Sequence, residues 1–393
     1  MGIMAGKVIL KKQAEKRLRW SHPWIFAGEI AKEQVQEGPG AIVDVLNSAG
    51  KFWGRGYWNP QSQIRVRLLT RKEEPVDEGF FFQRLRQCWH YRQQIGYTEN
   101  CRLVFAEADQ LPGLIVDKFG DYLVLQTLAL GMDRWKPAIV HALEQLLQPA
   151  GIYERNDAPV RELEGLPLTK GFLSKPFPTT FQIRENNLRF WVDVANGQKT
   201  GYFLDQRLNR LAIAPFVRDA EILEAFCYTG SFTCHAAAFG AKHITAIDAS
   251  ADALQLAQQN AELNGVSPSC TFLEANAFDV LKQWAGEKRS FDVVMLDPPA
   301  FAKSRQQIQS AITGYKEINL RALKMIRPGG FLITSSCTNL VPAPLFLEII
   351  QQAAADARRQ IRQVLFHTQP PDHPIVWTIE STAYLKFLIV QVQ

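Results

Sequence analysis

Residues 221–250, EILEAFCYTGSFTCHAAAFGAKHITAIDAS, contain an apolar run, a turn with one glycine, a helical segment and a second apolar run. This order predicts a strand, a helix and a parallel strand. Further strand-like runs follow at FDVVMLD (291–297), GGFLITSS (329–336) and AYLKFLIVQV (383–392). Between the runs we predict helices, one that begins at the N-cap Ser250 and one over 305–327 that ends in Arg-Pro-Gly-Gly. Alternating strands and helices are typical of a parallel sheet covered on both faces. We therefore predict an α/β domain over residues 181–393.

Two further domains are predicted before this one. Residues 1–75 contain short β-rich runs separated by glycine, such as AIVDVLNSAG (41–50), which indicate a small β domain. Residues 76–180 combine helical and strand-like patterns and end in a Pro- and Gly-rich stretch, which indicates a central α+β domain. At 393 residues the chain is too long for one ordinary core, in agreement with this division.

The composition excludes several classes of protein. With 47% hydrophobic and 21% charged residues, the chain is typical of soluble globular proteins, and no apolar stretch approaches the length of a membrane span. The N-terminus lacks the pattern of a secretory signal. Six cysteines lie at irregular intervals without a CxxC pair, which argues against a disulfide scaffold and a zinc site. We expect a cytoplasmic protein that binds neither a membrane nor a metal.

The positive charge is concentrated at the N-terminus. Residues 1–75 contain 13 Lys and Arg against 7 Asp and Glu, a balance of +6, whereas the whole chain has a net charge of +5. Aromatic residues interleave with these cations, and such a mixture can stack bases and bind phosphates. We expect RNA contacts from Arg19, Arg55, Arg65 and Arg67. A merely solvated basic surface is the alternative that the charge leaves open.

The first turn of the α/β domain indicates the cofactor. A dinucleotide would require GxGxxG, but here only Gly230 is present, between bulky Phe226 and Tyr228 on one side and a helix on the other. Asp248 ends the next strand, where a carboxylate suits two ribose hydroxyls. A ribose without a diphosphate fits S-adenosylmethionine (SAM). An ordinary turn glycine and a helix-capping aspartate are the alternative explanation of Gly230 and Asp248. After the third strand, Asn276 lies where an amide could accept from an adenine amino group.

Two later strand ends indicate the chemistry. FDVVMLDPPAF (291–301) ends a strand with two prolines and fixes Asp297 at the edge of the sheet. Cys337 ends the following strand after two serines. A thiolate that adds to C6 of cytosine makes C5 nucleophilic, and a carboxylate at N3 and N4 would stabilise the charge that develops on the ring. The thiol therefore has a task if the substrate is a pyrimidine.

Simpler explanations apply to similar residues nearby. Cysteine is often a small buried hydrophobic residue, and we assign Cys227, Cys234 and Cys270 to that class. A Pro-Pro turn with a solvated aspartate would also produce the motif at Asp297. Cys337 differs from the other cysteines by its position at a strand end.

Four segments resemble a known enzyme family. They are GQKTGYFLDQRLNR (197–210), EAFCYTGSF (224–232), DPPAFAKS (297–304) and SSCTN (335–339). They are similar to the RNA cytosine-C5 branch of the class I SAM-dependent methyltransferases, and within it to the ribosomal large subunit methyltransferase I family. The resemblance covers the whole chain, because RWSHPWIFAGEI (19–30) is similar to the family's PUA domain, an RNA-binding fold.

The resemblance implies a fold, a reaction and a set of site residues. The fold would be a Rossmann-like seven-stranded sheet preceded by a PUA-like domain and a central α+β domain. The reaction would be methylation of C5 of a cytosine in 23S ribosomal RNA, with Cys337 as nucleophile. The residues expected to contact SAM are Lys199, Thr200, Phe203, Arg207, Tyr228, Gly230, Asp248 and Asn276.

The sequence departs from the family at two positions. Asn276 stands where the family usually has an acid, and the DPPAF motif lacks a second cysteine that many relatives have there. The base that removes the C5 proton is therefore open among a water, Asp297 and His373.

Two other functions remain as alternatives. One is a SAM-dependent methyltransferase that acts on an exocyclic base amine, although Ala300 follows the prolines where that class has an aromatic residue. The other is a non-catalytic RNA-binding assembly factor. The oligomeric state also stays open, with a homodimer as one alternative.

Overall fold

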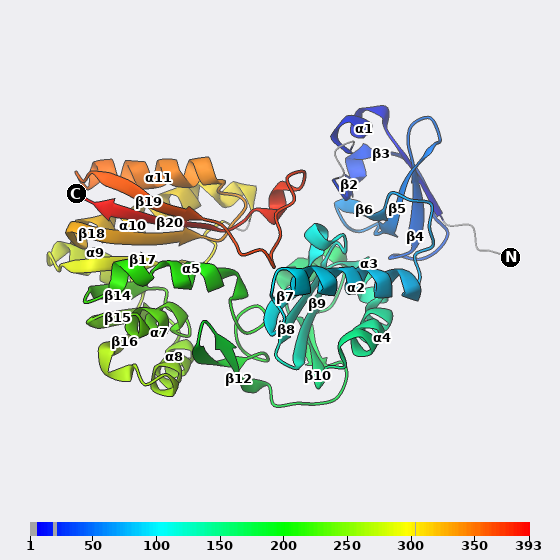
Figure 1. The fold of residues 1–393 in the computed structure, drawn as a ribbon. Coiled ribbons are helices and arrows are strands. Elements are labelled where there is room, and N and C mark those ends of the chain that lie inside the picture. Colours follow the sequence, from blue (N-terminus) through cyan, green and yellow to red (C-terminus); the bar gives the residue numbers. More distant parts are fainter. Residues whose placement is uncertain (1–5, 19–21, 303) are drawn as a thin grey trace. The chain divides into compact units, whose positions relative to one another are not determined.

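The computed structural model describes residues 6–18, 22–302 and 304–393. The chain divides into two compact units (Figure 1). Unit 1 consists of Met1–Phe181, Val192–Leu204 and Pro371–Thr382. Unit 2 consists of Gln182–Trp191, Asp205–Pro370 and Ala383–Gln393.

Unit 2 is built on a seven-stranded sheet, as the α/β pattern and the resemblance predicted. The first five strands in the spatial order are parallel, and β20 is antiparallel to both of its neighbours. The spatial order is β16 (Cys270–Glu274), β15 (His243–Asp248), β14 (Glu221–Ala225), β17 (Phe291–Leu296), β18 (Ile326–Ser336), β20 (Lys386–Val392) and β19 (Ile361–His367).

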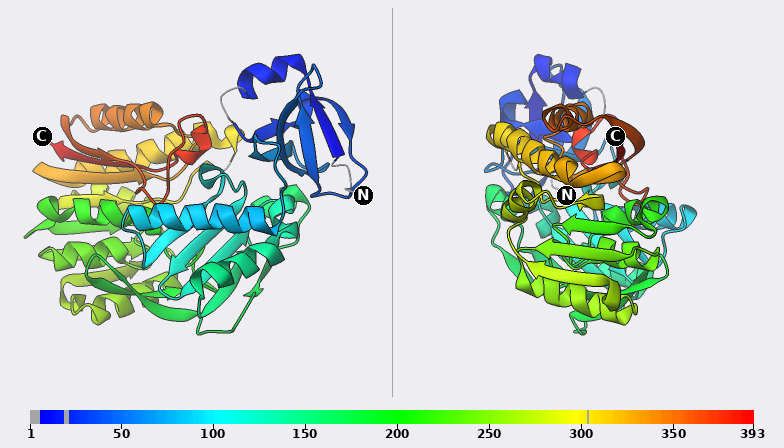
Figure 2. Two further views of the ribbon diagram at one scale, coloured as in Figure 1. Left: turned by 45° about the vertical axis from the view of Figure 1, so that its right-hand side comes forward. Right: turned by 90° about the vertical axis from the view of Figure 1, so that its left-hand side faces the viewer.

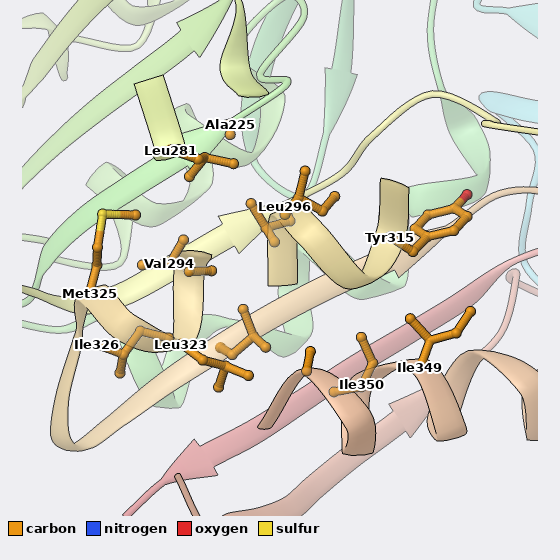
Figure 3. Close-up of a cluster of buried hydrophobic side chains, with 14 of the residues drawn as sticks. Ala225, Leu281, Val294, Leu296, Tyr315, Leu323, Met325, Ile326, Ile349 and Ile350 are labelled. Atoms are coloured by element: carbon orange, nitrogen blue, oxygen red, sulfur yellow. The ribbon is translucent and has the colours of Figure 1, made fainter. Parts of the chain in front are cut away.

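Helices cover both faces of this sheet, as Figure 2 shows. Alternate residues of β17 point to opposite faces: Val294 and Leu296 join one apolar core, and Val293 and Met295 join the other. The first core, part of which is drawn in Figure 3, is closed by α9 (Ala277–Gly286), α10 (Ile308–Met325) and α11 (Ala343–Asp356). The second is closed by α5 (Arg207–Ala212), α6 (Ala214–Val217), α7 (Ser231–Ala238) and α8 (Ala251–Leu263). A strand buried on both sides explains the uninterrupted apolar run of β17.

The start of α8 lies where the sequence predicts it, and the end of α10 lies two residues earlier than predicted. Ser250 caps α8, because its hydroxyl accepts a hydrogen bond from the Ala253 amide at 3.2 Å, as the sequence predicted. The sequence also predicted a helix over 305–327 that ends in Arg-Pro-Gly-Gly. In the structure α10 ends at Met325 and these four residues belong to β18, where they form an irregularity in the pairing with β17.

The N-terminal part of unit 1 is a six-stranded sheet with its own small apolar core. In spatial order its strands are β2 (Trp24–Phe26), β6 (Ile64–Thr70), β5 (Phe52–Trp58), β4 (Ile42–Leu46), β1 (Gly6–Leu10) and β3 (Ile30–Gln34). The helix α1 (Lys12–Leu18) buries Ala14 and Leu18 in the same core.

The central part of unit 1 is a five-stranded sheet with two long helices packed on it. The helices are α2 (Glu78–Gln94) and α4 (Lys136–Leu147), which share one apolar core with the strands. The spatial order is β11 (Thr169–Phe172), β10 (Gly151–Asn156), β9 (Tyr122–Thr127), β8 (Leu114–Phe119) and β7 (Asn100–Phe105).

These two parts of unit 1 share buried residues. Tyr57 of β5 lies in the central core, and its hydroxyl donates to the Pro112 carbonyl at 2.8 Å. Gly131 allows this approach, since a Cβ there would lie 2.0 Å from the Tyr57 ring. The β-rich part therefore depends on the central part for burial of one of its largest side chains.

Candidate functional site

Most candidate catalytic and cofactor-binding residues of unit 2 lie at the carboxyl ends of five parallel strands. β14 lies between β15 and β17, and β18 follows β17. Asp248 is the last residue of β15, Asp297 follows β17, and Cys337 follows β18. Parallel strands bring these ends to one edge of the sheet, which is where ligands bind in open α/β folds.

The turn after β14 is held in an unusual backbone conformation. Phe226, Tyr228 and Gly230 have positive φ angles of 67°, 49° and 72°. At Gly230 a side chain would also collide with α8, because a Cβ would lie 2.9 Å from the Cβ of Ala257. The Tyr228 amide donates to Asp248 Oδ2 at 2.8 Å, so the end of β15 helps to fix the turn.

The Asp248 carboxylate keeps capacity for a ligand. Its Oδ1 accepts from the Ser250 amide at 3.0 Å, so each carboxylate oxygen accepts one backbone hydrogen bond and retains lone pairs. The side chain is half-buried. This arrangement is compatible with two ribose hydroxyls donating to one carboxylate.

Asn276 has a structural task in α9. Its side-chain oxygen accepts from the Phe278 amide at 2.9 Å and so caps the helix. The residue is exposed after the end of β16, and its amide NH2 group donates to no acceptor within the part of the chain that the structure describes. An amide in this orientation donates rather than accepts, so an adenine ring nitrogen suits it better than an adenine amino group.

The segment 199–207 is divided between the two units. Lys199, Thr200 and Phe203 belong to unit 1, and Arg207 belongs to unit 2. Lys199 is exposed, with its ammonium 4.5 Å from the centre of the Phe203 ring. Thr200 is buried and donates to Asp117 Oδ2 at 2.6 Å, so its hydroxyl already serves the packing of unit 1.

Arg207 shares a buried carboxylate with a second arginine. Its Nε lies 3.5 Å from Glu185 Oε2, and Arg210 bonds Glu185 Oε1 at 2.9 Å. Two guanidinium groups on one carboxylate leave a net positive charge. Arg207 is the less buried of the two arginines, which suits it to a ligand carboxylate such as that of methionine.

A buried acid that sequence reasoning missed lies in β14. Glu224 is 2% exposed and accepts a hydrogen bond from the Thr233 hydroxyl. Burial, with the nearby charges of Asp297 and Asp248, raises the pKa of Glu224 to about 8. The only sequence signal was an acid within the apolar run EILEAF.

The acids at this edge fit a cationic ligand. The charges of Asp248 and Asp297 act on the buried Glu224 carboxyl, and two carboxylates beside a carboxyl favour a ligand with a positive charge. SAM has a sulfonium and an ammonium group, so the residues present fit it. No group of three or more His, Cys, Asp or Glu suited to a metal ion occurs within residues 6–18, 22–302 and 304–393.

The structure brings the Cys337 thiol next to the Asp-Pro-Pro motif. The Cys337 sulfur lies 3.8 Å from the carbonyl oxygen of Pro298, the residue after Asp297. The Asp297 carboxylate accepts from Gln206 Nε2 at 2.9 Å, which orients it. Both strand-end groups therefore lie within one small region of unit 2.

The other cysteines of unit 2 are less suited to nucleophilic chemistry. Cys227 and Cys234 are buried, and burial raises the pKa of each thiol. Burial also raises the pKa of Cys270 to about 12. All six cysteines of the chain are free thiols. Because the thiolate is the reactive form, these environments favour the inert thiol.

A buried lysine beside Cys337 was also missed. Lys386 is 3% exposed, pairs with Ser336 across β18 and β20, and donates to the carbonyls of Thr338 and Tyr384. Burial lowers the pKa of Lys386 to about 8, and the charge of Cys337 opposes this shift. An ammonium here favours the Cys337 thiolate. The sequence signal was one lysine within the apolar run AYLKFLIVQV.

His373, a candidate base, belongs to unit 1. It is 1% exposed, and its Nδ1 lies 3.0 Å from Asp372 Oδ1. Its Nε2 has no hydrogen-bond partner within the part of the chain that the structure describes. Asp372 also accepts from the Arg102 amide, so the pair is anchored to β7.

The predicted RNA-binding arginines are already engaged in ion pairs. Arg55 bonds Asp44 at 2.7 Å, and Arg65 lies 3.4 Å from Glu33. Arg67 is buried and bonds Glu164 at 2.9 Å. Arg19 lies outside the described residues. A paired and buried guanidinium is a poor phosphate ligand, so Arg67 favours a structural role, whereas Arg55 and Arg65 are paired but still partly exposed.

The seven-stranded sheet, with the carboxylates of Asp248 and Asp297 at the ends of its parallel strands, defines a class I SAM-dependent methyltransferase. Comparison with known families agrees. Residues 168–391 match the S-adenosylmethionine-dependent methyltransferase family, and residues 8–71 match the PUA-like domain family.

Full-length relatives specify the family. The chain is 38% identical over 386 residues to ribosomal RNA large subunit methyltransferase I of Salmonella arizonae, which covers 97% of this chain and 96% of the relative. It is 37% identical over 394 residues to the protein of that name from Alteromonas mediterranea, which covers 99% of each. The chain belongs to the ribosomal RNA large subunit methyltransferase I family.

Solved structures share the fold. A protein of Streptococcus mutans assigned as a SAM-dependent methyltransferase superposes with a TM-score of 0.84 at 21% identity and covers 99% of this chain and 100% of that one. A second, SMU.776, superposes with the same TM-score at 20% identity and was solved with S-adenosylhomocysteine. SAM is thus the cofactor of this fold and family. The helices of the described residues include none long and apolar enough to cross a membrane.

Proposed function

We propose that this protein methylates C5 of a cytosine in large-subunit ribosomal RNA, with Cys337 as the covalent nucleophile. The observation that supports this most is the half-buried Cys337 thiol, 3.8 Å from the Pro298 carbonyl and close to the buried Lys386. Methylation of an exocyclic amine would need no thiol at this position. The names of the curated relatives support ribosomal RNA as the substrate.

The residues of the chain divide the reaction between them. The Cys337 sulfur adds to C6 of the cytosine, and negative charge then develops on the ring. The Asp297 carboxylate accepts hydrogen bonds from the N4 amino group and from a protonated N3, and so holds the opposite edge of the base. When bound, SAM supplies the electrophilic methyl group that the activated C5 attacks. Loss of the C5 proton then allows the bond between sulfur and C6 to break, which restores the ring and the thiolate.

Lys386 would help at the first and last of these steps. Its ammonium favours the thiolate before addition and again when the sulfur leaves. Because its pKa is lowered to about 8, the amine is still mostly protonated at neutral pH. Lys386 therefore places a positive charge near the Cys337 sulfur at neutral pH.

The experiment is methyl transfer from labelled SAM to unmodified large-subunit ribosomal RNA, followed by digestion and identification of the nucleoside. We expect 5-methylcytidine from the native protein and none from Cys337→Ala, with SAM binding retained in the variant. Cys270→Ala removes another partly exposed thiol of unit 2 and serves as the matched control, since it should keep activity.

A second measurement tests the covalent step directly. RNA containing 5-fluorocytidine at the target position lacks the proton that must leave, so a complex resistant to denaturant should accumulate with the native protein. A methylated exocyclic amine as product, or full activity of Cys337→Ala, would contradict the proposal.

A further inference from the structure

A surface cavity of about 360 Å³ lies within unit 1. Three segments far apart in the sequence form its walls: the end of β6 with the residues after it, the start of the central part, and the segment 376–379. The volume is of the order of one nucleotide. None of the expected site residues lies in it.

The cations that line this cavity carry unneutralised charge. Arg71 donates to the carbonyls of Leu18 and His22, and Arg84 donates to the Leu69 carbonyl. Arg84 also bonds the neutral Gln110 side chain. No acid pairs with Arg71, Arg84 or the exposed Lys72 within the described chain. They differ in this from the paired arginines of β5 and β6.

The one acid in the cavity wall is engaged elsewhere. Glu107 accepts a hydrogen bond from the indole N–H of Trp24 at 2.9 Å. Against three cations it leaves an excess of positive charge at the mouth, and a positively charged concave surface concentrates anions.

A fully exposed tryptophan lies, in the sequence, between two residues that line the cavity. Trp377 is 96% exposed, while its neighbours Val376 and Thr378 line the cavity. Tryptophan usually buries most of its large surface, so an isolated indole in water forgoes a large stabilisation. Aromatic rings held in this way form stacking platforms for unpaired bases.

The segment that presents Trp377 is well anchored. The Val376 amide donates to the Thr382 hydroxyl at 2.9 Å, and that hydroxyl donates to the Ile379 carbonyl at 2.7 Å. Ile379 and Thr382 are themselves buried. A turn held by hydrogen bonds and buried side chains therefore presents Trp377 to solvent.

We propose that this cavity binds an unpaired nucleotide of the substrate RNA, with Trp377 stacked on its base and Lys72, Arg71 and Arg84 around its phosphate. The inference rests on the proposed function only in taking RNA as the substrate. None of the residues proposed for methyl transfer lines this cavity, and we therefore assign it to a nucleotide other than the one that is methylated. An indole and three cations favour RNA over a protein partner, whose docking would require a larger apolar surface.

Filter binding of unmodified, in vitro transcribed large-subunit ribosomal RNA tests the site in the absence of SAM. Because a stacked base contributes about 1–3 kcal/mol, we expect Trp377→Ala to weaken binding roughly 5- to 150-fold, with the salt dependence unchanged. Trp377→Phe should recover most of the affinity. Lys72→Gln should weaken binding and lower the slope of log K against log salt by about 0.7, the value for one phosphate of a single strand.

The control removes the same charge outside the cavity. Lys51→Gln lies on an exposed turn between β4 and β5 and should bind RNA as the native protein does. In methyl transfer, the Trp377 and Lys72 variants should raise KM and leave kcat nearly unchanged.

The two proposals fail in different ways. RNA binding by Trp377→Ala and Lys72→Gln at native strength would overturn the nucleotide site, whichever product the enzyme makes, and would leave a protein partner as the occupant of this surface. A product other than 5-methylcytidine would overturn the proposed function while the binding comparison remains valid.

Discussion

Replacement of Glu224 by glutamine should change how stability depends on pH. The carboxyl is fully buried next to Thr233, and its pKa is raised from an ordinary value of 4.5 to about 8. Glutamine has nearly the same shape, its carbonyl can still accept from the Thr233 hydroxyl, and it does not titrate. The substitution therefore removes the protonation equilibrium of Glu224 and changes little else at this position.

The sign follows from the raised pKa. Between about pH 4.5 and pH 8, the folded protein holds a proton on Glu224 that the unfolded chain has lost. The contribution of this group to the free energy of unfolding is complete below pH 4.5 and is lost as the pH rises to 8. One pH unit corresponds to about 1.4 kcal/mol, so the shift amounts to roughly 5 kcal/mol across this window.

Urea unfolding of the native protein and Glu224→Gln at pH 5, 6, 7 and 8 measures this difference. We expect the variant to gain stability relative to the native protein with each step in pH. Glu221→Gln, on the exposed start of the same strand, is the matched control and should show no such trend, because its pKa is lowered by Lys242. A difference between native protein and Glu224→Gln that stays constant from pH 5 to 8 would refute the reasoning.

Three further substitutions test other parts of unit 2. Asp248→Ala should raise the Kd for SAM by about 10- to 150-fold for each hydrogen bond lost, as measured by calorimetry, because a hydrogen bond to a charged group contributes about 1.5–3 kcal/mol, and an unaltered Kd would exclude the ribose contact. Lys386→Met should lower the rate of methyl transfer at least about 10-fold at neutral pH with little change in the urea midpoint. The stability should change little because two effects oppose each other: removal of the buried ammonium gains roughly 3 kcal/mol, from a pKa lowered from 10.5 to about 8, and the two carbonyls that Lys386 bonds lose their donor. A native rate of methyl transfer would count against a role of Lys386 beside Cys337. Glu185→Ala should reduce the free energy of unfolding by about 3–5 kcal/mol, since it leaves the buried Arg210 and the partly buried Arg207 without this carboxylate, and a loss below 1 kcal/mol in urea unfolding would disagree.

The order of elements in unit 2 and the residues at its strand ends could be predicted from local sequence patterns. Apolar runs, the Ser250 cap and the Pro-Pro stop act over a few residues, so their outcome can be predicted without knowledge of distant contacts. The same local signals placed Asp248, Asp297 and Cys337 at one edge, because parallel strands of an α/β sheet share a direction.

The burial and the partners of the charged residues could not be predicted from local patterns, because they depend on tertiary contacts. Lys386 meets Cys337 through the pairing of β18 with β20, across about fifty residues of sequence. Arg67 pairs with Glu164, and the basic cavity joins the end of β6 to the segment around Trp377. Burial and pairing depend on which distant segments pack together. The local sequence around a charged residue does not show whether its side chain lies in water, in an ion pair or beside a nucleophile.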